Sequence, residues 1–216
     1  WSPLVHPRDT QETNQVASIA NITRVFNEEQ KFPEMNCYLI SKLYADYTGA
    51  GKTADKTVLT TVNVLEGFDA MMTYMDNKRV PRAGRILYVT PDTRTLITNA
   101  KQIVKTLDVS KRSEAVKRAI TSIDEVEIPD SVPSDMMKTA YDFTEGWKVD
   151  TAADQINMCL VHPLAVITPI NYEFAQLDPP SAGSEGKWDY FEESFEDVFL
   201  LPNKVDAIAF NITPHA

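Results

Sequence analysis

The residues whose types and spacing come nearest to a chemical site are Gly49-Ala50-Gly51-Lys52-Thr53, which end like a phosphate-binding loop. The full pattern needs a glycine five positions before Gly51, where this sequence has Asp46. It also needs a buried strand before the loop, whereas a helix is expected here. Without a cradle of backbone N–H groups, Lys52 has little help in holding a phosphate. We therefore predict a flexible connection between two helices, with a nucleotide-binding enzyme as the alternative.

The histidines and cysteines are too scattered to predict a metal site. His6, His162 and His215 form no His-Glu-x-x-His pair, and Cys37 and Cys159 have no partner at metal-ligand spacing. We expect both cysteines to be reduced and buried. We expect His162, which precedes a proline, to be a hydrogen-bonded turn residue.

The carboxylates of residues 189–197 (DYFEESFED) are dense enough to suggest binding of a hard cation. Their spacing is not that of a calcium loop, and the central glycine is absent. Ser184 is not a nucleophile elbow either, because glycine is missing two residues before it. We expect no catalytic, cofactor-binding or metal-binding residue. The acidic run is interpreted as a solvated face, with an intersubunit contact as the alternative.

Helices dominate the first half of the chain. Asp9 and Glu12 have the form of a capping box, and apolar residues at helical spacing follow to about Glu29, predicting one of the longest helices. A break is expected at Lys31-Phe32-Pro33, because proline disfavours helical geometry in the residue before it. Three further helices are expected at residues 33–48, 60–77 and 93–106.

Strands dominate the C-terminal third, and they indicate an α+β fold rather than regular alternation. Residues 178–186 (DPPSAGSEG) have turn and loop composition throughout. A short strand is expected earlier, at residues 85–89, and a short helix followed by a strand at residues 113–128. The later strands are expected at residues 156–161, 165–170, 172–177, 195–201 and 205–212.

Charge is unevenly distributed along the chain. Residues 78–118 carry eleven basic and three acidic side chains, a net charge of +8, whereas residues 171–216 carry two and nine, a net charge of −7. The simplest interpretation of this distribution is that the charged side chains lie on solvent-exposed surfaces. A nucleic-acid patch is disfavoured, because the acidic remainder would repel phosphate. Our hypothesis is that two faces of a self-associating subunit meet. Arg79, Arg82 or Arg85 of one copy would then approach the Glu192, Glu193 and Glu196 cluster of another, directly or across water.

Five stretches, in order along nearly the whole chain, resemble the major capsid proteins of tailed bacteriophages. The first is similar to the family's spine-helix region, although Asn36 stands where the family commonly has aspartate. The others resemble a strand-to-helix element, an Ile-Pro and Val-Pro segment, a Val-His-Pro stretch and the closing strands. They are Asp9 to Leu43, Val80 to Ile97, Ile120 to Phe143, Gln155 to Pro180, and Phe199 to Ile212.

The resemblance implies a Hong Kong 97-like fold with a spine helix, a peripheral domain and an axial domain. Residues 1–60 would supply the spine helix and part of the peripheral domain, and residues 61–190 mainly the axial domain. Residues 191–216 would supply closing strands of the peripheral domain. The family's N-terminal arm and extended loop are expected to precede Trp1, because this sequence does not contain them.

The resemblance also implies a function without catalysis. The chain is expected to assemble in the bacterial host cytoplasm into pentamers and hexamers of an icosahedral virion shell. Scaffold and portal proteins would be partners and packaged DNA only a loose one. No apolar run approaches the roughly 20 residues of a membrane span, so no membrane is expected. An encapsulin-like compartment shell, which shares the fold, is the alternative, together with the nucleotide-binding enzyme.

Overall fold

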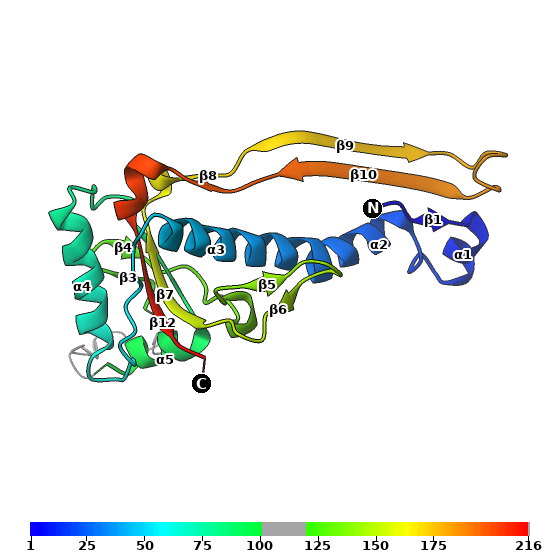
Figure 1. Cartoon of the computed structure of the whole chain (residues 1–216). Coiled ribbons are helices and arrows are strands. Elements are labelled where there is room, and N and C mark those ends of the chain that lie inside the picture. Colours follow the sequence, from blue (N-terminus) through cyan, green and yellow to red (C-terminus); the bar gives the residue numbers. More distant parts are fainter. Residues whose placement is uncertain (101–119, 216) are drawn as a thin grey trace. The chain divides into compact units, whose positions relative to one another are not determined.

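The computed structural model of the chain describes residues 1–100 and 120–215 and divides into two compact units. The first unit contains residues 1–39 and 168–198, and the second contains residues 40–167 and 199–216. Both units are therefore built from two separated stretches of sequence (Figure 1). The expected borders at residues 60 and 190 concern a peripheral and an axial domain, and they stay a prediction. The hairpin around residues 170–196 belongs to the first unit, and the closing strand belongs to the second.

The first unit opens with two short helices, α1 (Pro7–Glu12) and α2 (Ile19–Phe26). The expected capping box at Asp9 is wrong, because the His6 side chain caps α1 by accepting the Arg8 N–H at 3.1 Å. Residues 13–17 then form turns, with Asn14 and Gln15 at positive φ. The Ser18 hydroxyl accepts the Asn21 N–H and so begins α2.

The helix does not break at Pro33, which corrects the sequence prediction. A π-helical turn, η1 (Asn27–Lys31), joins α2 to α3 (Phe32–Gly49), an 18-residue helix. Proline lacks an N–H and its ring crowds the carbonyl four residues earlier. Widening the helix by one residue just before Pro33 relieves that crowding, and π turns are a known site of such adjustment. The helix then ends at Gly49, followed by Gly51 at positive φ, as the sequence predicts.

A long hairpin completes the first unit. Strand β9 (Ile170–Asp178) pairs antiparallel with β10 (Trp188–Glu196), and β1 (Leu4–Val5) pairs with the other edge of β10. The loop between β9 and β10 lies where its turn-rich composition predicts. The N-terminus continues the ladder, since the Glu192 N–H donates to the Trp1 carbonyl at 2.9 Å.

The second unit has a five-stranded mixed sheet in the order β12-β7-β2-β4-β3. Only the β2–β4 pair is parallel. Strands β7 and β12 are mostly buried and mostly apolar, as expected of strands covered on both faces. The strands are β2 (Ile86–Val89), β3 (Ser122–Ile123), β4 (Val126–Glu127), β7 (Gln155–Val161) and β12 (Ile208–Thr213).

Helices α4 (Val64–Asn77) and α5 (Pro91–Thr98) contribute to the core of the second unit. Phe68 and Met75 of α4 pack with Leu87 and Leu160 of the sheet, and all four are at most 1% exposed. Helix α4 begins four residues later than predicted. The Asn63 side chain accepts the Thr60 N–H at 2.7 Å, so residues 60–63 form a turn before the helix.

Several short elements connect these larger ones. The end of the helix expected at residues 93–106 and the helix expected after Ser113 lie outside the described residues. No helix among residues 1–100 and 120–215 combines the length and apolar character needed to span a bilayer. The short elements are β5 (Tyr141–Asp142), β6 (Lys148–Val149), β8 (Val166–Ile167), β11 (Phe199–Leu200), and the 3₁₀ turns η2 (Ser134–Met136), η3 (Pro163–Ala165) and η4 (Pro202–Ala207).

Candidate assembly surface

One face of the β9–β10 hairpin carries a row of exposed aromatic side chains. Tyr172 pairs with Phe195 across the strands, and Phe174 pairs with Glu193 two residues further along. Phe191 precedes Glu193 by two positions on β10 and so lies on the same face. The four aromatic side chains are 39–57% exposed, and their rings contact one another in pairs, with centroids 5.7 and 6.0 Å apart. We call Tyr172, Phe174, Phe191, Glu193 and Phe195 the aromatic face.

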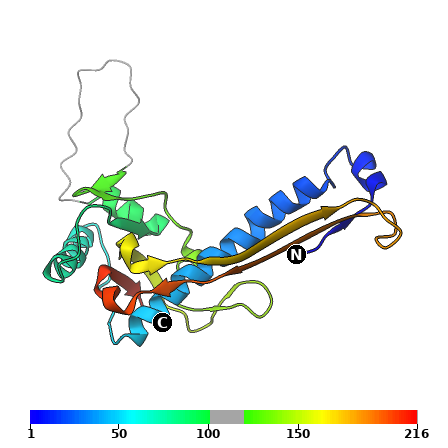
Figure 2. The ribbon, with the colours of Figure 1, turned by 90° about the horizontal axis from the view of Figure 1, so that it is seen from above.

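Figure 2 shows the hairpin running alongside the helical segment of the same unit, and β10 contacts that segment on the opposite face of the hairpin. Glu192 forms an ion pair with Lys31 at the end of the π turn, and Tyr190 donates its hydroxyl to Glu192 at 2.9 Å. The Lys31 hydrogen bond is the largest influence holding the pKa of Glu192 below its usual range, followed on the same side by the Tyr190 hydroxyl. Alternate residues of β10 thus face different surroundings.

A groove of about 520 Å³ lies on this packed side, between α2 and the hairpin. Two polar atoms in its wall, Thr23 Oγ1 and Asn27 Oδ1, are shielded from solvent and have no hydrogen-bond partner among the described residues. Its wall is otherwise mainly apolar. It is lined by Ile19, Ala20, Thr23, Arg24, Asn27, Glu28, Phe32, Leu177 and Tyr190.

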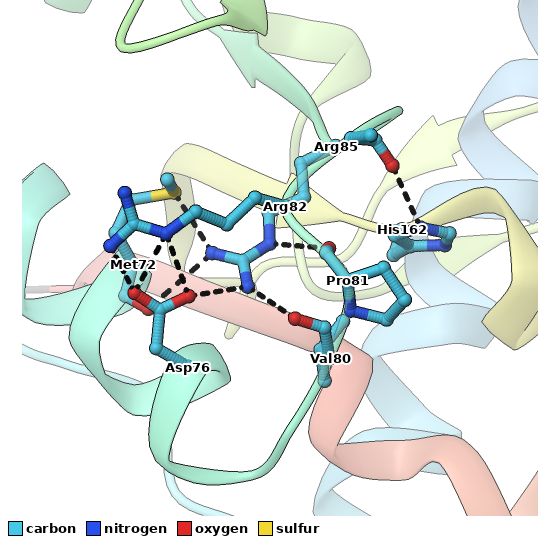
Figure 3. A network of polar contacts seen from close by, with 8 residues as sticks. Met72, Asp76, Val80, Pro81, Arg82, Arg85 and His162 are labelled. Atoms are coloured by element: carbon cyan, nitrogen blue, oxygen red, sulfur yellow. Dashed lines mark hydrogen bonds and ion pairs between the residues drawn. The ribbon is translucent and has the colours of Figure 1, made fainter.

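Arg85 lies in the interior of the second unit, which corrects its predicted place at a subunit contact. The residue is 1% exposed, and its guanidinium forms an ion pair with Asp76 at 2.7 Å (Figure 3). It also donates to the carbonyls of Pro81, Val80 and Met72 at 2.9, 2.7 and 3.4 Å. These bonds close residues 76–85 into a loop around one cation. The guanidinium is fully used within its own chain.

The other predicted contact residues remain on the surface, but not all of them lack partners. Arg82 forms an ion pair with Asp76, and these two arginines hold the pKa of the Asp76 carboxyl below its ordinary value. In the described part of the chain, no ion pair engages Arg79, Glu193 or Glu196, and all three are exposed. The three arginines lie in the second unit and the three glutamates lie in the first, so neither unit contains a contact between the two groups.

His162 is a buried turn residue, as the sequence predicts. Its Nδ1 accepts the Leu164 N–H at 3.2 Å, so the neutral ring carries its proton on Nε2 and donates to the Ala83 carbonyl at 3.1 Å. The ring therefore fastens the same loop that Arg85 holds from the other side (Figure 3). Gly84 follows at φ +85°, a conformation that favours glycine.

The side chain of Lys52 is held by an ion pair, whereas the sequence predicts a flexible connection between two helices. Its amino group pairs with Asp206 at 2.6 Å, and the Tyr74 hydroxyl donates to the same carboxylate at 2.5 Å. The hydrogen bond to Asp206 is the main influence raising the pKa of Lys52. This network joins the loop after α3 to α4 and η4. Lys52 thus has a structural partner where a phosphate-binding loop would need its amino group available.

Both cysteines are buried, as expected, and burial raises the pKa of the Cys159 thiol to about 12. A thiol with so high a pKa is a poor nucleophile at neutral pH. Within residues 1–100 and 120–215, no three His, Cys, Asp or Glu side chains gather as metal ligands would.

The aromatic face is the functional candidate that sequence reasoning missed. The alternation of β9 was visible in Ile170, Tyr172 and Phe174 at spacing two, and it was assigned only to an apolar strand. The missing information was that the helix covers the other side of the hairpin.

No family sequence model matches the chain, and no curated protein sequence does so. Solved structures do match it. The mature capsid of bacteriophage PhiM1 superposes with a TM-score of 0.63 at 13% identity, over 100% of this chain and 70% of its own. The capsid of Cyanophage P-SCSP1u gives 0.60 at 10%, over 100% and 72%. A structure from Mycobacterium phage Che8 gives 0.60 at 11%, over 98% and 68%.

The chain shares its fold with these three phage structures. The α+β class and the Hong Kong 97-like fold expected from the resemblance are confirmed by this match, which spans essentially the whole chain. At identities of 10–13% the match establishes the fold, and a shared fold alone does not assign a function.

Proposed function

We propose that the chain is a structural subunit of a bacteriophage capsid, which self-assembles into an icosahedral shell around the viral genome. The observation that carries the proposal is the match of the complete fold to two structures described as phage capsids. The partner with the strongest claim is a second copy of the chain, in pentamers and hexamers. Scaffold and portal proteins and loosely held DNA belong to the same proposal. So do assembly in the host cytoplasm and the absence of catalysis.

The surface of the first unit supports self-association. The four aromatic side chains of the aromatic face and Ile170 are solvent-exposed although they lie close together on one sheet. Contiguous apolar surface of this kind marks interaction sites in soluble proteins. A subunit that is surrounded by other subunits in a shell would have that surface covered. The proposal therefore explains why β9 is apolar and alternating without being buried in its own chain.

Two other functions compete with this one. An encapsulin-like compartment shell has the same fold, so the fold does not separate it from a phage capsid. A nucleotide-binding enzyme built on Lys52 is disfavoured, because the Lys52 amino group is held by Asp206 and Asp206 also binds Tyr74. The loop also follows a helix rather than a strand.

Electron microscopy of the gene product that contains this sequence, expressed alone and with its scaffold, tests the proposal. We expect closed shells of uniform diameter whose subunits lie in five- and six-membered rings. A protein that stays monomeric under both conditions contradicts self-assembly. Shells that enclose a host enzyme and no nuclease-protected DNA, even with the packaging proteins present, would favour the compartment. Calorimetric titration with ATP tests the enzyme, and we expect no heat of binding.

A further inference from the structure

Glu193 occupies an unusual position for a carboxylate on an exposed strand. On the aromatic face it lies directly opposite Phe174, and Phe191 and Phe195 precede and follow it at spacing two. Tyr172 completes the frame, paired with Phe195. Side chains that face one another across antiparallel strands have Cβ atoms about 4.5–5.5 Å apart, and diagonal neighbours about 7–8 Å. Four aromatic rings therefore surround one negative charge.

Such an arrangement suits one chemical class of ligand, a guanidinium group. The planar cation can pair with the carboxylate and stack on aromatic faces at the same time. An ammonium group has no planar surface that can stack on an aromatic ring. A purely apolar ligand would cover the negative charge of Glu193 without providing an opposite charge. In the described part of the chain Glu193 has no ion-pair partner.

Among the described arginines, Arg79 has the properties that this ligand needs. Its side chain is exposed, and no ion pair engages it among residues 1–100 and 120–215. The other described arginines are committed. Arg8, Arg24, Arg82 and Arg85 form ion pairs, and Arg94 donates to the Pro129 carbonyl at 2.6 Å.

Hydrogen bonds within the chain also fix the backbone of the segment that carries Arg79. Arg79 lies at φ 61° just after the end of α4, and its N–H donates to the Asp76 carbonyl at 2.9 Å. Arg85 and His162 fasten the following residues. A loop that is already ordered loses less conformational entropy on binding than a mobile one does. Residues 78–100 also carry five basic side chains and one acidic side chain, a net charge of +4, which complements the −7 of residues 171–216.

We propose that the aromatic face of one copy binds the Arg79 guanidinium of a second copy, with Glu193 as the ion-pair partner. This contact rests on the proposed self-assembly and narrows it to two surfaces. It is a head-to-tail contact, in which different surfaces of the two copies meet, and such contacts generate closed rings.

Charge reversal in the assembling protein tests the contact. We expect Glu193→Arg and Arg79→Glu each to slow assembly about tenfold at low salt, measured by light scattering, since steering charges act on the association rate. The double variant, which restores opposite charges, should recover most of the rate. Mixing the two single variants should recover part of it only if the contact lies between copies. Equal rates for all variants, or no recovery in the double variant, overturn the proposal.

Glu173→Arg is the matched control. It makes the same change of charge on the same hairpin, at an exposed residue that pairs with Ser194 on the other face. We expect it to slow assembly much less than Glu193→Arg does. Equal slowing by both would mean that only the overall charge of the hairpin matters, and the specific contact would be wrong. Circular dichroism of each variant confirms that the fold is retained.

A peptide separates this inference from the proposed function. A synthetic peptide of residues 76–83 (DNKRVPRA) should perturb the aromatic NMR signals of Tyr172, Phe174 and Phe195 in the wild-type chain. Replacing its first arginine with alanine, or using the Glu193→Arg protein, should abolish the effect. Peptide binding without shells would contradict self-assembly and leave the arginine site intact. Shells without peptide binding or charge-reversal effects would leave self-assembly intact and refute the site.

Discussion

Strands β9 and β12 both carry apolar side chains, but the two strands differ in how far these side chains are buried. Strand β12 is buried at five of its six residues, whereas all nine residues of β9 are exposed. Both are antiparallel strands with aromatic and β-branched residues, which favour strand structure. The difference lies in what covers them. In the second unit the apolar side chains stabilise the chain's own fold, and in the first unit they remain available to another molecule.

The layers of the two units explain this contrast. In the second unit β12 lies at an edge of the five-stranded sheet, beside β7, and Phe210 packs against Tyr44 and Tyr47 with ring centroids 5.4 and 5.2 Å away. In the first unit β10 contacts the helical segment on one face of the hairpin, and no further layer of the described residues covers the aromatic face. A sheet needs a second layer to bury an apolar face. On the proposed function, a second copy would supply that layer for the aromatic face.

The largest expected effect is on Phe210, the buried aromatic of β12. Phe210→Ala should lower the free energy of unfolding by about 3–5 kcal/mol, because it removes a fully buried ring and leaves a cavity. Urea denaturation followed by circular dichroism measures the loss. Phe210→Leu, which keeps much of the volume, should lose distinctly less. A loss below about 1 kcal/mol for the alanine variant would remove the contrast between the units.

A smaller effect is expected at Asp206, which carries the polar network of the second unit. Hydrogen bonds from Lys52 and then Tyr74 hold the pKa of Asp206 below its ordinary value. Because the folded-state pKa is the lower one, ionised Asp206 stabilises the fold above the unfolded-state pKa of about 3.9, and this contribution disappears as pH falls through the folded-state pKa. Asp206→Asn should therefore cost about 0.5–1 kcal/mol at pH 7 and progressively less in acid.

Urea midpoints between pH 7 and pH 3 measure that dependence. The variant Lys52→Met serves as the matched comparison, because it removes the partner and keeps the aliphatic stem. The two changes should be less than additive in a double-mutant cycle. Full additivity would show that Lys52 and Asp206 do not interact in solution, and would return the loop to the flexible connection predicted from its sequence.

The ion pair between Lys31 and Glu192 is the corresponding link in the first unit. Lys31→Met should weaken the first unit by about 1 kcal/mol, since the pair is only partly exposed and joins the π turn to β10. Hydrogen exchange should quicken in the amides of β10 while those of β7 stay unchanged. Lys56→Met, at an exposed lysine of the second unit, is the control. Equal quickening in both units would mean that they unfold as one.

The smallest expected effect on stability is at Phe174. Phe174→Ala should change the free energy of unfolding by no more than about 0.5 kcal/mol, as for other surface substitutions. The same change should clearly slow assembly, measured by light scattering beside the wild type, because it removes the ring opposite Glu193. A destabilisation comparable with that of Phe210→Ala would show that the aromatic face is already covered within its own chain.

The sequence by itself determined most of the local structure. Apolar alternation and bulky strand residues placed β7, β9 and β12, and Pro and Gly placed the ends of β2 and α3 where the structure has them. These signals are local, so no distant contact can change them much. Helix starts were less predictable. His6 and Asn63 form the starts of α1 and α4 through side-chain bonds that several neighbouring residues could have made as well.

The tertiary structure alone decided which candidate residues are available for contact. Spacing along β10 shows that Glu192 and Glu193 point to opposite faces, yet it does not say which face the helix covers. The same limit applies to Arg79, Arg82 and Arg85, which have similar chemistry in sequence. Only the position of Asp76 on α4 commits Arg85 to the interior, engages Arg82 at the surface and leaves Arg79 exposed. Charge and hydrophobicity belong to residues, whereas burial depends on what the rest of the chain places beside them.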